Sequence, residues 1–66
     1  MKVSEIDLAY VKEYLNADDD ELRLQQHLDS AKDLLMKANG YTDESELDRS
    51  EYLADVVLVY VEQLYD

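Results

Sequence analysis

The sequence predicts an all-α protein: a small three-helix bundle, with a four-helix arrangement as the alternative, in a single domain over residues 1–66. Three segments place apolar residues at the three- and four-residue spacing of an amphipathic helix, and acidic stretches separate them. The one run rich in strand-forming residues, 56–61, has no second strand to pair with, and its flanks continue a helical pattern. We therefore expect helices over residues 7–16, 19–39 and 49–65.

The first helix is expected to begin at Asp7 and to end near residue 16. Asp7 is a favourable N-cap, and Ile6 before it is placed to pack against Val11. Ser4 with Asp7 three residues later is a competing capping box, which would start the helix earlier. The spacing assigns four residues to the buried face: Leu8, Val11, Tyr14 and Leu15.

The second helix follows an acidic turn. Asp18 or Asp19 can cap it, and the remaining acids then lie in its first turn, where the helix dipole favours negative charge. Gly40 is well placed to end this helix, with Lys37 in the last turn. Its expected core stripe is Leu24, Leu28, Ala31, Leu35 and Ala38.

A polar, acidic loop over residues 41–47 is expected to lead into the third helix. Asp48 with Glu51 three residues later fits a capping box at its start. The middle of this helix is apolar on every side, and such a helix is normally buried all round. The face expected to close the core carries Leu53, Val56, Val57, Tyr60 and Leu64.

The other face of the third helix is the candidate interface with a second subunit or another partner. A chain of 66 residues has little material to cover a helix that is apolar all round, so a neighbouring molecule is expected to complete its burial. The alternative is that the first two helices wrap it from both sides. Tyrosine is enriched at interfaces, so the tyrosines outside the core are either interface residues or simple surface residues: Tyr10, Tyr41, Tyr52 and Tyr65. Tyr14 and Tyr60 are assigned to the core. The candidate interface residues are Leu58, Val59, Val61, Tyr65, Tyr52 and Tyr41.

The charge balance argues against several kinds of partner. The chain has 6 basic and 17 acidic residues, for a net charge of −11. Without a basic patch, binding to a nucleic-acid backbone is not expected, sequence-specific binding included, and a lipid surface is disfavoured for the same reason. The longest apolar run is too short to span a bilayer, and the residues after Met1 lack the apolar run expected of a signal peptide, so none is expected. An acidic wall past which DNA slides is compatible with this charge, as is a plain solvated surface.

No group of residues supports catalysis or metal binding. The chain has no Cys, one His (His27) and one Gly, which excludes a thiolate site, a multi-histidine metal site and a glycine-rich phosphate loop. The acidic cluster that begins at Asp18 has Arg23 and Asp29 at the sixth and twelfth positions, where an EF-hand calcium loop needs Gly and Glu. We expect no enzyme, and no catalytic, metal-binding or cofactor-binding residues.

The order of these elements resembles a known family. The first helix ends in Lys12-Glu13-Tyr14-Leu15, and Asp18-Asp19-Asp20 form the acidic turn. Spaced apolar residues follow in the second helix, at Leu24, Leu28 and Ala31, and a later apolar helix closes from Leu58 to Tyr65. This arrangement is similar to that of the gp6-like head-tail connector proteins of tailed phages, which act in head completion and DNA packaging.

The resemblance implies a structural protein of the virion, located at the head-tail junction and, during assembly or prophage expression, in the host cytoplasm. Copies would form a homo-oligomeric ring under the portal protein, extend the DNA channel and contact a tail-side completion protein. An acidic lumen would repel the DNA phosphates. The alternative is a small acidic regulatory protein that mimics DNA and binds a basic protein partner, in which case moderate salt would abolish binding.

Overall fold

The computed structural model describes residues 1–17 and 20–65 and shows a small all-α helical bundle, which confirms the predicted fold class. No strand occurs within these two ranges. The described residues form three α-helices and two short 3-10 helices. In chain order the elements are η1 (Val3–Glu5), α1 (Leu8–Leu15), α2 (Glu21–Asn39), η2 (Glu44–Arg49) and α3 (Tyr52–Tyr65).

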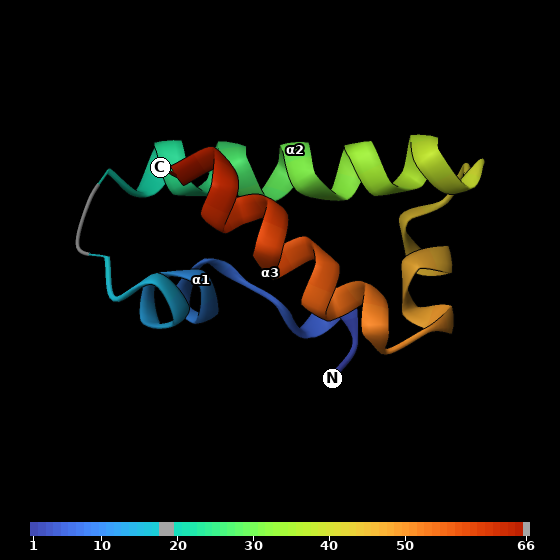
Figure 1. The fold of residues 1–66 in the computed structure, drawn as a ribbon, viewed down its shortest axis with the longest axis horizontal. Helices are drawn as coiled ribbons and strands as arrows, with labels where there is room; N and C mark the ends of the chain where they lie inside the picture. Colours follow the sequence, from blue (N-terminus) through green and yellow to red (C-terminus); the bar gives the residue numbers. More distant parts are fainter. Residues whose placement is uncertain (18–19, 66) are drawn as a thin grey trace.

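Helix α2 is the longest element, and α3 crosses it diagonally (Figure 1). Helix α3 packs mainly on α2, while α1 packs on both of them. The N-terminal turn η1 packs on η2 and α3, so the two ends of the sequence meet in one bundle. The backbone N–H of Ser4 donates a hydrogen bond at 2.9 Å to Asp48 Oδ1, 44 residues later, and this bond holds the N-terminal segment in place.

Helix α1 begins at the expected cap. The backbone N–H of Tyr10 donates to Asp7 Oδ1 at 2.8 Å, which confirms Asp7 as the N-cap. The competing start at Ser4 is not used, because residues Val3–Glu5 form the separate turn η1. Asn16 ends α1 in a left-handed conformation, with φ of 52°, which asparagine adopts more readily than most residues.

Both ends of α2 carry recognisable caps. Asp20 Oδ1 accepts a hydrogen bond from the N–H of Leu22 at 3.0 Å. The predicted caps Asp18 and Asp19 lie outside the described residues. Gly40 ends the helix with φ of 70°, a left-handed conformation that confirms its predicted role.

The core stripe of α2 is confirmed at Leu24, Leu28, Ala31 and Leu35, which are all buried. Ala38 was expected to share this stripe but is exposed. Leu35 is the last buried residue of α2, and the helix continues to Asn39. The stripe therefore stops one turn before the helix does.

The segment predicted as a loop contains the 3-10 helix η2. Asp43 caps it, with Oδ1 accepting from the N–H of Ser45 at 3.0 Å. Leu47 is 0% exposed and belongs to the core. The loop prediction was wrong here because a single leucine among acidic residues gives no periodic signal. Leu47 thus fixes the connection between α2 and α3 to the rest of the bundle.

Helix α3 begins at Tyr52, later than the predicted start at residue 49. The predicted capping box is wrong, because both of its acids bind the N-terminal segment instead. Asp48 accepts from the N–H of Ser4, and Glu51 lies 3.4 Å from the amino group of Met1. Residues 56–61 are helical, as expected from their flanks.

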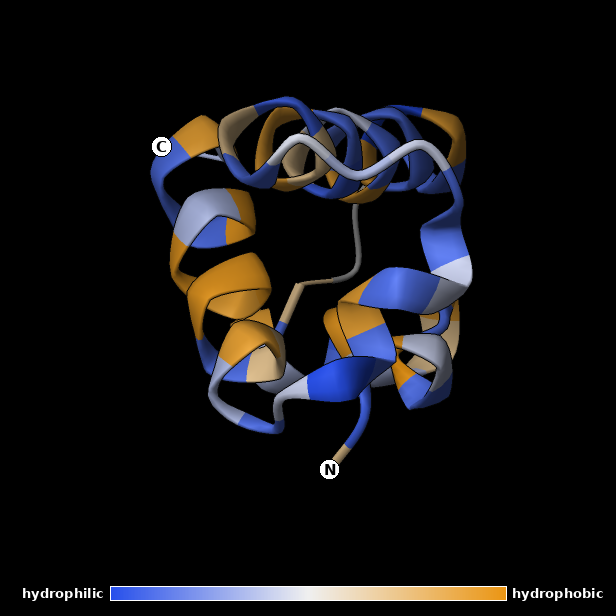
Figure 2. Cartoon of the chain, turned by 90° about the vertical axis from the view of Figure 1, so that its right-hand side faces the viewer, coloured by the Kyte–Doolittle hydropathy of each residue, from blue (hydrophilic) through white to orange (hydrophobic). Residues whose placement is uncertain are grey.

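Hydrophobic residues cover more of α3 than of α2, where they alternate with polar ones (Figure 2). Five residues of α3 are buried: Leu53, Ala54, Val57, Leu58 and Val61. Val56 and Tyr60 are half-buried at the edge of the core. Leu64 was expected in the core but is exposed, because it lies in the final turn of α3, beyond the last buried residue of that helix.

We expect the substitution Leu47→Ala to destabilise the protein strongly. Truncating a buried leucine costs about 2–5 kcal/mol, whereas a domain of this length has a total stability of roughly 3–10 kcal/mol. Urea unfolding followed by far-UV circular dichroism measures the loss. Leu22→Ala is the matched control, because Leu22 is 67% exposed and its truncation should change the free energy of unfolding by no more than about 0.5 kcal/mol. Equal losses in the two variants would contradict the burial of Leu47.

Candidate interaction surface

The predicted interface divides into buried and exposed residues. Leu58 is 5% exposed and Val61 is 0% exposed, so the expectation that both face solvent was wrong. Helix α3 packs mainly on α2, and α1 and η1 also pack against it. Leu58 and Val61 are part of the resulting buried core. The alternative that other elements of the chain wrap the third helix therefore holds for these two residues.

The other candidates lie nearer the surface. Val59 is 49% exposed and Tyr52 is 63% exposed. They are seven residues apart on α3, which places them on one side of the helix, together with the exposed Asp55. Tyr65 is half-buried, and Tyr41 packs against the core with the guanidinium of Arg49 5.9 Å from its ring centroid.

A second exposed surface lies beside this face of α3. Of its residues, Tyr10 was an interface candidate from the sequence, whereas the others were missed. Tyr10, Glu13 and Tyr14 of α1 line a hollow of about 230 Å³. The hydroxyl of Tyr14 donates to Glu62 Oε2 of α3 at 3.3 Å, so the hollow borders the seam between the two helices. We call these four residues, Tyr10, Glu13, Tyr14 and Glu62, the tyrosine hollow.

Tyr14 was predicted to be a core residue but is 44% exposed. Val11 is the buried residue of α1, with Leu8 and Leu15 half-buried beside it, and this orientation leaves Tyr14 at the edge of the helix. The available signal was the repeat of tyrosine at positions 10 and 14, which lie one above the other on a helix.

The pKa of the Tyr14 phenol is raised above its ordinary value. Partial burial is the main cause, followed by the charge of Glu62 and the hydrogen bond to it, with smaller effects from Asp55 and Tyr10. Each of these disfavours the phenolate. Tyr14 therefore stays protonated at neutral pH and can keep donating its hydrogen bond to Glu62.

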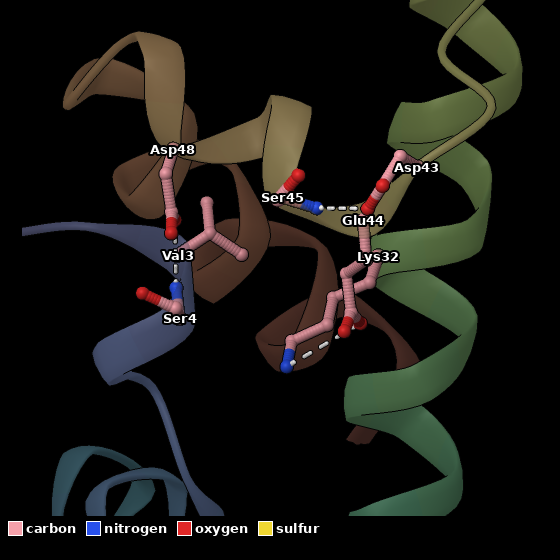
Figure 3. Close-up of a pocket in the computed structure, with 7 residues that line it drawn as sticks. All are labelled: Val3, Ser4, Lys32, Asp43, Glu44, Ser45 and Asp48. Atoms are coloured by element: carbon pink, nitrogen blue, oxygen red, sulfur yellow. Dashed lines mark hydrogen bonds and ion pairs between the residues drawn. The ribbon is translucent and has the colours of Figure 1, made fainter.

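A groove of about 300 Å³ lies between the N-terminal segment, α2 and η2 (Figure 3). Its polar groups already have partners. Asp48 accepts from the N–H of Ser4, and Lys32 Nζ lies 3.8 Å from Glu44 Oε1, with 15% of the Lys32 side chain exposed. Hydrogen bonds and the neighbouring lysines lower the pKa of Asp48. We interpret this groove as a structural clamp rather than as a ligand site.

The described part of the chain provides no group of three or more His, Asp or Glu residues that could hold a metal ion. His27 is half-buried on α2, and its Nε2 atom is buried without a hydrogen-bond partner among the described residues. Within residues 1–17 and 20–65, no helix has both the length and the hydrophobicity to cross a membrane.

Comparison with known proteins found no matching family, no similar curated protein and no similar solved structure. The surfaces described above therefore carry the functional argument. They are the outer face of α3 and the tyrosine hollow.

We expect Asp48→Asn to reduce stability at neutral pH and to have less effect in acid. The pKa of Asp48 is lower in the folded protein, so its carboxylate stabilises the fold above the unfolded-state pKa of about 4. This contribution disappears as the pH falls through the folded-state pKa. The free energy of unfolding, measured by urea titration from pH 7 to pH 3, should show wild type and variant converging in acid.

Glu13→Gln is the control for the loss of one negative charge. No backbone N–H donates to the Glu13 carboxylate in the described residues, so Glu13→Gln should reduce stability at pH 7 less than Asp48→Asn does. A gap between wild type and Asp48→Asn that stayed constant down to pH 3 would contradict the role assigned to the Asp48 carboxylate.

Proposed function

We propose that this protein is a structural head-tail connector of a tailed phage, which forms a ring under the portal protein and extends the DNA channel. The support from the sequence is the order of a short helix, an acidic turn, a long helix and a later apolar helix. The fold has helices at corresponding places, at residues 8–15, 21–39 and 52–65.

The observation that carries the proposal is the outer face of α3. Tyr52 and Val59 are exposed on a helix whose opposite side forms the core. Exposed apolar residues of this kind, gathered on one helix, are typical of a protein–protein contact. The contact we propose is narrower than the one expected from the sequence, because Leu58 and Val61 are already buried.

A ring requires a head-to-tail contact, in which this face packs on a different face of the next copy. Leu34 of α2 is also exposed, at 49%, and offers an apolar contact on a different helix. The outer face of α3 and the region around Leu34 could therefore supply the two sides of a heterologous interface. A portal protein and a tail-side completion protein would then contact the two rims of the ring.

The charge of the surface supports the proposed channel. Three of the lysines form ion pairs with acids of the same chain: Lys12 with Glu21, Lys32 with Glu44 and Lys37 with Asp33. Each of these pairs joins one base to one acid, so it does not change the net charge of −11. The chain has too few bases to balance its remaining acids. Acids that line a channel would repel DNA phosphates and keep the duplex from adhering.

Native mass spectrometry over a wide range of protein concentration tests the proposal. We expect a closed, ring-sized multiple for wild type and loss of this species in Val59→Asp, with unchanged far-UV circular dichroism. Leu34→Asp is matched to it, because Leu34 and Val59 are both 49% exposed. A charge at Leu34 should also weaken the ring if α2 supplies the second face.

If Leu34→Asp keeps the ring and Val59→Asp loses it, the second contact lies elsewhere on the chain. A strict monomer or dimer of wild type at every concentration would contradict self-assembly of the isolated protein. That result would favour the alternative, a small acidic regulator that binds a basic protein.

A further inference from the structure

We propose that the tyrosine hollow on α1 accepts the side chain of an arginine from a basic segment of a different protein. The proposal does not depend on the connector assignment, because it rests on the hollow itself. The hollow is lined by residues of α1 within one chain, and the hydrogen bond from Tyr14 to Glu62 joins its edge to α3.

The size of the hollow suits a single side chain. Its volume is about 230 Å³, and pockets for small molecules usually measure about 300–1,000 Å³. Tyr10 and Tyr14 are four residues apart, so both rings border the same space on one face of α1. Both side chains are exposed, at 37% and 44%, which leaves ring surface free for an incoming group.

The charges around the hollow select a cation. Glu13 lines it, and Glu62 is attached to its edge by the hydrogen bond from Tyr14. Asp55 of α3 is close enough to influence the Tyr14 phenol. No basic side chain lines the hollow, since Lys12 of the same helix forms its ion pair with Glu21 at the start of α2. An aromatic wall with carboxylates at its edge is therefore left without a counter-charge in the described residues.

The geometry favours arginine over lysine and over a metal ion. A guanidinium group is planar, stacks on an aromatic ring and still presents N–H groups to a carboxylate at its edge. Lysine lacks the planar surface, and no metal-binding group of acids exists in the described part of the chain. The protein already contains one contact of this type, where Arg49 lies over the ring of Tyr41.

The partner we infer is a different protein rather than another copy. The net charge of −11 attracts a basic segment of another protein at long range. The chain itself contains few arginines that could enter the hollow of another copy. Arg49 is engaged with Tyr41, which leaves Arg23 as the other arginine of the chain.

The test is an NMR titration of the full chain with a blocked pentapeptide, Ser-Gly-Arg-Gly-Ser. The two comparison peptides carry lysine or uncharged citrulline in place of arginine. We expect saturable shifts at the residues of the hollow, tighter binding of the arginine peptide than of the lysine peptide, and no binding of the citrulline peptide. Raising the salt from 20 to 500 mM should weaken binding, because the pair is charged and exposed.

Variants locate the binding. Tyr10→Ala and Glu62→Gln should each weaken the arginine peptide about two- to fivefold, the range of an exposed cation–π or ion-pair contact. Asp29→Asn is the control matched to Glu62→Gln, since it removes an exposed carboxylate outside the hollow. This control should not change the affinity.

Three results would overturn the proposal. The first is an equal loss of affinity in the control variant, or chemical shifts spread over all acidic segments. Either would indicate unspecific electrostatic attraction. The second is no binding at the highest peptide concentration. The third is that the same residues shift with protein concentration when no peptide is present, and that Arg23→Ala removes this shift. The occupant of the hollow would then be an arginine of another copy. Ring formation is measured separately, so failure here leaves the connector proposal intact.

Discussion

The fold depends on burying the apolar side chains of α3. Five of its fourteen residues are buried, and Val56 and Tyr60 add half-buried surface at the edge of the core. In a chain of 66 residues no single element is large enough for this task. Helix α2 covers one side, and α1 with η1 covers another. Burial of this apolar helix is the main source of stability in a domain that has neither disulfides nor a described metal site.

The acids of the chain serve local structure as well as net charge. Asp7, Asp20 and Asp43 each accept a hydrogen bond from a backbone N–H at the start of a helix. Asp48 does the same for the N-terminal segment. These side chains satisfy donors that water would otherwise have to satisfy, and they place negative charge where the helix dipole favours it. A very acidic composition is therefore compatible with a compact fold.

The main elements of the fold could be predicted from the sequence, because α1 and α2 have caps and periodic apolar residues. Asp7 and Gly40 mark their boundaries by local chemistry alone. The failures share one cause, which is that burial depends on distant segments. Nothing in the acidic sequence around Leu47 indicates a buried leucine, and the bond from Ser4 to Asp48 joins residues 44 positions apart. The tyrosine hollow needs Glu62 from α3 beside Tyr14 of α1, and no spacing within one helix predicts that pairing.

The position of η1 has a consequence for synthesis of the chain. Val3 and Ile6 precede every other buried residue in the sequence, yet they are buried in a cluster that includes Leu47 and residues of α3. Long-range contacts of this kind form only after the intervening chain is available, and they are slower to form than contacts within one helix. On the ribosome these two side chains therefore stay uncovered until η2 and α3 have been translated, and the N-terminal turn cannot dock before then.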